Sequence, residues 1–224
     1  MGLDRVISGT TVCAALLLLA VAGCDDQTRP DRLLHGQPAA EFRPVEGSVV
    51  SQTRVLRAEF LGQRLTVCLT SADRANFPPD TVVVERVGVF AESLTFLDRG
   101  SRHVYSCDGG IDASGERPRP WCGGSVGRLH DGRLLDPRLD VLCRDPGGKP
   151  LAYAWIEPVA GSRWVGVDQG PYTELYEVAA GLPVRIASAR RVDRQESRAT
   201  FEVTQYDERG RELLKGEVEA AVAG

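Results

Sequence analysis

The chain has 224 residues, with 27 lysines and arginines against 31 aspartates and glutamates, so its formal net charge is -4 at pH 7. The charges are mixed along the chain without a basic cluster. This excludes nucleic-acid binding, because neutralising phosphates requires a basic face. The length suffices for one large or two small domains.

The first segment, residues 1–23, has the three parts of a secretory signal peptide. Arg5 lies in the N-terminal part, where Asp4 offsets its charge, and an apolar stretch and small residues follow. The apolar run at residues 12–23 is too short for a membrane-spanning helix, which needs about 20 residues. A secretory signal cleaved after Gly23 and an internal core strand are the other interpretations.

The segment ends in Val21-Ala22-Gly23-Cys24. It resembles the signal peptide of bacterial lipoproteins, in which a lipobox ends in small residues followed by cysteine. The resemblance is confined to this end of the chain. It implies cleavage before Cys24 and attachment of fatty acyl chains, such as palmitate, to that residue. Two or three acyl chains are enough for stable anchoring in a bilayer, so the expected location is the cell membrane, facing the periplasm or exterior.

Residues 24–47 contain scattered prolines and charged residues and show no apolar periodicity. This composition predicts a flexible polar tether between the lipid site and the folded part of the chain.

From Ser48 onward the pattern predicts β-strands separated by glycine- and proline-containing turns. In the first half, strands are expected at residues 64–70, 81–87, 93–97 and 103–107. Residues 108–124 are rich in glycine and proline and predict a loop or a domain junction. In the second half, strands are expected at residues 139–143, 151–156, 163–167, 172–178, 182–186, 199–206 and 212–220.

The strongest local signal is the last pair of strands. Gly210 occupies the position at which a hairpin turn favours a left-handed residue. A short helix starting near Leu213 is the alternative, although Gly216 and the alternation after it favour a strand. In the strand at residues 172–178, strict alternation places Tyr172, Glu174, Tyr176 and Val178 on one face.

No segment shows a sustained helical period, and short strands recur with turns between them. The predicted fold class is therefore all-β, with one or two disulfide-bonded antiparallel β-sandwich-like units. The expected domains are residues 48–120 and residues 121–224.

Four cysteines follow Cys24, namely Cys68, Cys107, Cys122 and Cys143. An even number in an exported chain predicts two disulfides. The preferred pairing joins Cys68 to Cys107 and Cys122 to Cys143, since each pair then falls inside one expected domain. The alternative joins Cys107 to Cys122 and Cys68 to Cys143.

Tyr105 lies two residues before Cys107, which resembles the tyrosine corner of immunoglobulin-like domains. The resemblance implies a sandwich with Cys68 on an earlier strand as the disulfide partner. The chain departs from that family because no tryptophan lies between the two cysteines. A tyrosine on an inward strand face explains the same residues.

Three groups of residues invite chemical interpretations, and none fits well. His103, Cys107, Cys122 and His130 lack the paired spacing of zinc ligands. The oxygens from Asp108 to Glu116 do not match a calcium loop. Ser125 lies in Gly123-Gly124-Ser125-Val126-Gly127, but no histidine follows in the order that a hydrolase elbow requires. No metal, no cofactor and no enzymatic activity are expected.

Four aromatic residues of the second half, Trp155, Trp164, Tyr172 and Tyr176, form the candidate binding surface. Facing outward they would stack on peptide or glycan, and facing inward they would fill a sandwich core. The expected function is that of a membrane-anchored envelope lipoprotein acting as a non-catalytic binding or assembly module. Its expected partners are the bilayer and another envelope protein. The alternatives are a small-ligand or glycan binder using the aromatic surface, and a hydrolase.

Overall fold

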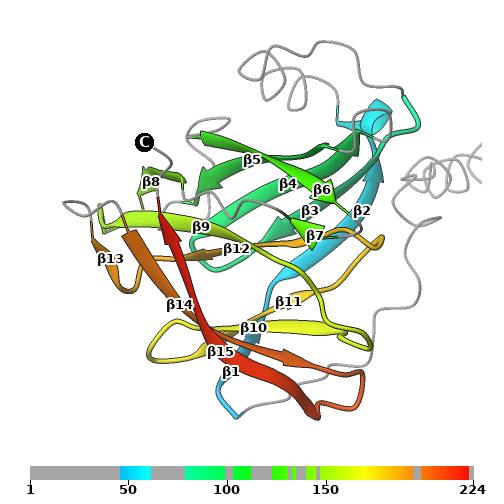
Figure 1. Cartoon of the computed structure of the whole chain (residues 1–224). Coiled ribbons are helices and arrows are strands. Elements are labelled where there is room, and N and C mark those ends of the chain that lie inside the picture. The colour runs from blue at the N-terminus through cyan, green and yellow to red at the C-terminus, as the bar shows by residue number, and fades with distance from the viewer. Residues whose placement is uncertain are drawn as a thin grey trace, which may run out of the picture.

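The computed structural model describes residues 46–61, 79–98, 103–111, 123–130, 133–134, 140–144, 147–193 and 198–221, with backbone only for residues 123–144 and 220–221. These ranges consist almost entirely of strands (Figure 1), which confirms the all-β fold class. The elements are β1 (Ser48–Val50), β2 (Gln52–Arg57), the 3-10 turn η1 (Ala58–Phe60), β3 (Val82–Val87), β4 (Ala91–Asp98), β5 (His103–Gly110), β6 (Gly123–His130), β7 (Arg133–Leu134), β8 (Asp140–Arg144), β9 (Pro150–Ile156), β10 (Trp164–Asp168), β11 (Thr173–Glu177), β12 (Val184–Ser188), β13 (Val192–Asp193), β14 (Arg198–Tyr206) and β15 (Glu212–Ala221).

The strands form three sheets. The N-terminal sheet has six strands in the order β2-β3-β4-β5-β6-β7, and the middle sheet has the order β12-β9-β8. The C-terminal sheet has the order β1-β11-β10-β14-β13, with β15 on the other side of β14. Neighbouring strands are antiparallel except for β1 and β11, which run parallel.

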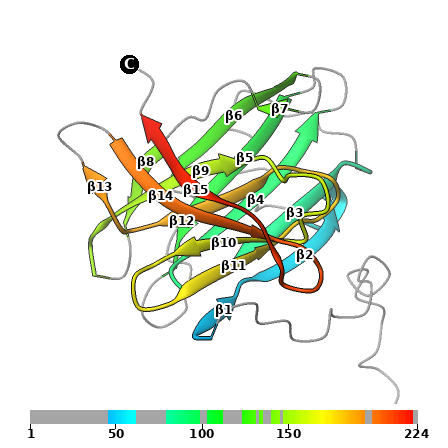
Figure 2. The same cartoon turned by 60° about the horizontal axis from the view of Figure 1, so that its bottom comes forward.

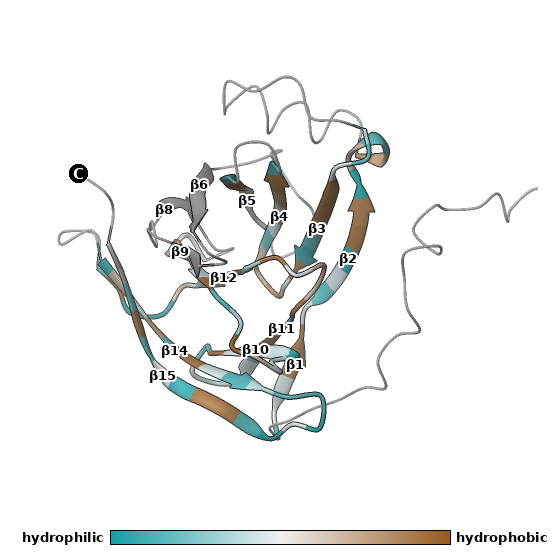
Figure 3. Ribbon diagram, turned by 45° about the vertical axis from the view of Figure 1, so that its right-hand side comes forward, coloured by the Kyte–Doolittle hydropathy of each residue, from teal (hydrophilic) through white to brown (hydrophobic). Residues whose placement is uncertain are grey.

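The middle sheet lies between the other two (Figures 1 and 3). Strand β9 shows why, since successive side chains of a strand point to opposite faces. Ala152, Ala154 and Ile156 pack with residues of β10 and β14 in the largest core cluster. Leu151 and Tyr153 pack on the opposite side with Ala91 of β4. Burial on both faces explains the nearly continuous apolar sequence of β9.

The C-terminal hairpin matches the sequence prediction. Strands β14 and β15 pair from Arg198 opposite Ala221 to Tyr206 opposite Glu212, with a register shift near Tyr206. Gly210 has a φ of 80°, the left-handed conformation that favours glycine. Asp207 closes the turn, because its Oδ1 accepts hydrogen bonds from the backbone N–H of Arg209 and of Arg211, both at 2.9 Å. The alternative of a short helix after the turn is wrong.

Elements of the two expected domains share sheets and core. Strand β1 pairs with β11 (Figure 2), and the backbone N–H and hydroxyl of Ser51 donate hydrogen bonds to the carbonyl of Leu175, at 2.9 and 3.0 Å. The chain then enters the N-terminal sheet through β2. The expected boundary at residues 120 and 121 lies outside the described residues.

Both ends of the range predicted as a loop, residues 108–124, belong to strands. Strand β5 continues through Asp108 to Gly110, and β6 already begins at Gly123. Asp108 and the two glycines were interpreted as turn residues, but they pair with Ser93, Glu92 and Ala91 of β4. The strand predicted at residues 64–70 lies outside the described residues.

Candidate functional site

The most unusual feature of the fold is a layer of polar side chains between the N-terminal sheet and the other two sheets. Strand pairing aligns Thr53, Arg86, Ser93 and Asp108 in one row across β2, β3, β4 and β5. Thr95 and Ser106 follow in a second row on the same face. All of these residues except Thr53 are buried. A sandwich interior is usually apolar, so each buried polar group here requires a partner.

Asp108 and Arg185 form an ion pair at the centre of this layer. Nη2 of Arg185 lies 2.6 Å from Oδ2 of Asp108, and both side chains are 0% exposed. Ser106 donates a further hydrogen bond to Oδ2 at 3.1 Å. The guanidinium of Arg185 also lies over the rings of Tyr153 and Trp155, at 5.4 and 5.0 Å from the centroids. A buried pair with so many contacts fixes the middle sheet against β5.

Tyr153 adds a second connection between the same sheets. Its hydroxyl donates to the carbonyl oxygen of Gly109 at 2.9 Å. Burial, and next the charge of Asp108, raise the pKa of Tyr153 well above its usual range. The phenol therefore remains protonated and keeps this donor.

Glu174 of β11 binds the turn between β3 and β4. Its Oε1 accepts a hydrogen bond from the backbone N–H of Val89 at 2.9 Å, and its Oε2 accepts one from Nε2 of Gln169 at 3.2 Å. Burial raises the pKa of Glu174, while the hydrogen bonds from Val89, Tyr176 and Gln169 lower it in part. This carboxyl group therefore connects the N-terminal and C-terminal sheets.

Arg86 is different, because its side chain is buried with few partners. Nη2 donates to the carbonyl oxygen of Glu177 at 3.1 Å. Within the described ranges, its Nε and Nη1 have no hydrogen-bond partner, and the same holds for the hydroxyls of Thr53 and Thr95. The carboxylate of Glu177 pairs with Arg163 instead. Burial lowers the pKa of Arg86 to about 10, so this guanidinium is still charged at neutral pH.

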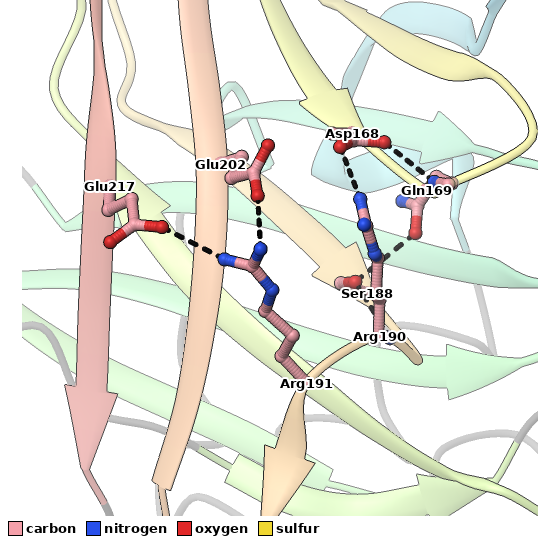
Figure 4. Close-up of polar contacts among 8 residues, drawn as sticks. Asp168, Gln169, Ser188, Arg190, Arg191, Glu202 and Glu217 are labelled. Carbon is pink, nitrogen blue, oxygen red and sulfur yellow. Dashed lines mark hydrogen bonds and ion pairs between the residues drawn. The ribbon is translucent and has the colours of Figure 1, made fainter.

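An ion-pair network covers part of the outer surface (Figure 4). Arg190 pairs with Asp168 of β10. Arg191 binds Glu202 of β14 at 2.6 Å and Glu217 of β15 at 2.9 Å. The bond from the backbone N–H of Gly170 is the main cause that lowers the pKa of Asp168. Exposed pairs of this kind contribute little stability singly, and Glu217 remains 64% exposed beside Arg191.

The aromatic residues do not form the exposed surface that was one interpretation of the sequence. Trp155, Trp164 and Tyr176 are buried, with at most 5% of their surface exposed, and only Tyr172 is half-buried. Trp155 contacts Arg185, and Trp164 packs in a small cluster with Leu175 and Tyr206. The candidate aromatic binding surface is therefore wrong for these three residues, because all three side chains pack in the interior of the protein.

Only some of the cysteines predicted to be lipidated or disulfide-bonded lie within the described residues. Cys107 is disulfide-bonded and lies in a core cluster with Leu56, Leu61 and Tyr105, where Tyr105 stacks on Phe96 at 5.4 Å. Cys24, Cys68 and Cys122 lie outside the described residues, and Cys143 is described as part of the backbone of β8. The pairing therefore stays a prediction.

The serine motif does not have the geometry of a nucleophile elbow. Gly123 to Gly127 lie inside β6, and Ser125 pairs with Ser106, whereas an elbow is a sharp turn between a strand and a helix. Asp108, one of the residues considered as calcium ligands, instead accepts a hydrogen bond from Arg185. Within the described ranges, no three histidine, cysteine, aspartate or glutamate side chains gather as a metal site would require.

The described ranges also hold no helix with the length and hydropathy needed to span a bilayer. Comparison of the chain with family models, with curated proteins and with solved structures gave no match in any of the three. The functional argument therefore depends on the residues of this chain alone.

Sequence reasoning missed Arg86, Glu174 and Arg185 as members of one site. A signal was present for both arginines, since each is a charged residue next to valine or isoleucine in a short strand, at Val82–Val87 and Val184–Ser188. A charge in the middle of such a strand is either at an exposed edge or paired in the interior. The sequence does not reveal which strands face each other, so the partners were not predictable.

Proposed function

We propose that this protein is a lipid-anchored component of the bacterial cell envelope and acts as a non-catalytic binding or assembly module for another envelope protein. The observation that carries the proposal is Cys24, which follows small residues and an apolar run and precedes a polar segment. Acyl chains on this residue would hold the β body close to the bilayer, facing the periplasm or exterior.

The properties of the β body support a binding role. The three sheets are connected through buried polar contacts, among them the fully buried ion pair of Asp108 and Arg185. Such a body changes shape little when it binds. Strand edges and exposed apolar side chains, including Phe60, Val89 and Leu214, are the features through which β proteins commonly recognise an extended partner segment.

Anchoring is tested by metabolic labelling with an alkyne analogue of palmitate in cells that express the full chain. The wild type and Cys13→Ala incorporate label and partition into detergent, whereas Cys24→Ala does neither. Cys13 is the matched control, because it lies in the same segment but would be removed with the signal peptide. Label that persists in Cys24→Ala would contradict the proposed anchor.

Binding is tested by photo-crosslinking in cells, with a photoreactive amino acid placed at Phe60, Val89 or Leu214 in separate variants. These residues are 47%, 50% and 48% exposed. A heterologous adduct from at least one position, which is lost when Cys24 is replaced, is the expected result. If all three positions react only with water or lipid, the binding role is refuted. The labelling experiment then still shows whether Cys24 carries acyl chains.

One observation favours a second candidate function, the binding of a small anion in the interior. Arg86 is buried with two nitrogens that lack partners within the described ranges, and Thr53 and Thr95 offer unpartnered hydroxyls on the same sheet face. Buried groups of this kind usually bind ordered water or a ligand. A carboxylate, phosphate or chloride would supply the missing negative charge.

Thermal unfolding in chloride, phosphate and acetate, against a buffer that contains only large organic anions, tests this second function. A saturable rise in Tm with one anion, absent from Arg86→Met, is expected. The exposed Arg198→Met variant is the matched control. An equal response of all three proteins would mean that Arg86 binds only water.

A further inference from the structure

Strand β15 is a long edge strand with one neighbour. It has ten residues and pairs with β14 along its length, and within the described ranges no strand pairs with its other edge. In Figures 1 and 2 it forms the outer border of the C-terminal sheet. Its central residues Leu214, Lys215, Gly216 and Glu217 are all exposed. The unpaired N–H and C=O groups of such an edge can pair with another strand unless the protein covers or blocks the edge.

We propose that β15 pairs with β15 of a second copy of this chain, antiparallel and centred on Gly216. The result is a symmetric dimer in which the two C-terminal sheets become one continuous sheet. The inference goes beyond the proposed function and does not depend on the lipid anchor. The evidence is the sequence of β15. When two copies of this strand are aligned antiparallel, one register places opposite charges and apolar residues across from each other.

The symmetry restricts the registers sharply. A two-fold axis through an antiparallel strand pair places one residue opposite itself, and that residue fixes all other pairs. A centre on Lys215 or Glu217 places identical charges opposite each other. A centre on Val218 places Glu217 opposite Glu219. Like charges in directly opposed positions destabilise a sheet, so these three registers are disfavoured.

A two-fold axis centred on Gly216 places opposite charges across from each other. Lys215 of each copy then lies opposite Glu217 of the other, and Leu214 lies opposite Val218. These pairs cover the regular part of the strand, since the register shift against β14 occurs nearer the turn. A centre on Leu214 avoids like charges but pairs only the first half of the strand. Gly216 is therefore the centre that combines attraction with length.

The neighbouring structure fits this register. Val218 packs at the margin of the largest core cluster, so Leu214 of the second copy, 48% exposed in the single chain, would extend that core across the interface. Glu217 pairs with Arg191 at 2.9 Å (Figure 4) and is still 64% exposed, so its carboxylate is accessible to a second cation. A Cβ added to Gly216 would meet nothing within 4 Å, so the centre of the edge is open.

Disulfide trapping tests the register directly. In Gly216→Cys, the two new cysteines are directly opposed, within the Cα separation of about 4.5–5.5 Å of strand pairs that a disulfide can bridge. In Lys215→Cys they are two residues out of register and beyond the limit of about 7 Å. With the full chain in the cells that express it, under mild oxidation, a dimer band is expected for Gly216→Cys, at least tenfold stronger than for Lys215→Cys. Equal bands, or none at position 216, would overturn the proposal.

Charge reversal provides an independent test that needs no new cysteine. Lys215→Glu and Glu217→Lys each replace two attractive pairs by two repulsive pairs, so each should weaken dimerisation by about tenfold. The double variant restores opposite charges and should recover most of the affinity. Glu208→Lys, in the exposed turn, is the matched control. The dissociation constant of the full chain in detergent is measured by dilution with fluorescence transfer, and a double variant as weak as the single ones would exclude this register.

Discussion

The carboxylate of Glu174 occupies the space in which a side chain on Gly88 would lie. A Cβ added to Gly88 would be 2.1 Å from Oε1 of Glu174, and the same oxygen accepts the hydrogen bond of the next residue, Val89. The absence of a side chain at Gly88 is therefore what lets β11 approach the turn between β3 and β4. This contact joins residues far apart in the sequence.

Gly88→Ala should consequently destabilise the fold. The new methyl group must displace the carboxylate, which is held by Val89 and Gln169, and forced rearrangements of this kind cost about 1–3 kcal/mol. Gly216→Ala is the matched control, since a Cβ there meets nothing within 4 Å. The free energies of unfolding are measured in urea at a protein concentration where the chain is monomeric. A Gly88→Ala variant as stable as the control would show that Glu174 moves away freely.

Replacing each of the two buried arginines by methionine should affect the free energy of unfolding differently. Arg185→Met leaves Asp108 as an uncompensated buried charge, and removal of one partner of a buried pair costs about 3–5 kcal/mol. Arg86 has only the carbonyl of Glu177 as a described hydrogen-bond acceptor. In anion-free buffer, Arg86→Met should therefore be as stable as the wild type, or more stable by about 1 kcal/mol.

Chemical denaturation of the two variants under identical conditions checks this contrast. The methionine side chain keeps much of the arginine volume in both cases, so the difference reports the charge and not a cavity. A large loss of stability in Arg86→Met would mean that its guanidinium has stronger partners than the one hydrogen bond to Glu177.

Glu174 should make the stability depend on pH in a predictable direction. Burial raises its pKa above the ordinary value of 4.5, so the folded state holds this proton more tightly than the unfolded state does. The resulting stabilisation is fully present below pH 4.5 and is lost as the pH rises through the folded-state pKa. The difference in free energy of unfolding between wild type and Glu174→Gln should therefore fall with increasing pH and then become constant.

Urea denaturation at a series of pH values provides the curve, with the exposed Glu208→Gln variant as the matched control. A difference that increases with pH would mean that the hydrogen bonds to the carboxylate outweigh its burial.

Local sequence patterns were sufficient for most strands of the second half. The alternation in Arg198–Tyr206 depends only on which side chains are buried, and Gly210 identifies its turn by itself. The extension of β5 was not predictable in this way. Asp108 and Gly109 have turn-forming residue types, and they belong to a strand because Arg185 neutralises the aspartate and β4 supplies hydrogen-bond partners.

The residues of the candidate site were harder to predict from the sequence than the strands. Thr53, Arg86, Ser93 and Asp108 become one row only through the register of four strands. Trp155 was ambiguous for a similar reason, because its burial depends on the N-terminal sheet covering that face of β9. The lipid anchor is the reverse case: the evidence for it is in the sequence around Cys24, and that residue lies outside the described ranges.

The position of Cys107 favours one of the predicted disulfide pairings. Its side chain lies in the core cluster that contains Leu56, Ala58 and Leu61, on the sheet face opposite to that of Asp108. Leu61, the last described residue before Cys68, belongs to this same cluster. We therefore expect Cys68 to pair with Cys107, which leaves Cys122 to pair with Cys143. Mass spectrometry of non-reduced peptides should find these two linkages, and Cys68→Ala should lose stability by the same amount as Cys107→Ala and as the double variant. A linkage between Cys107 and Cys122 would show instead that the disulfide lies within the connection from β5 to β6.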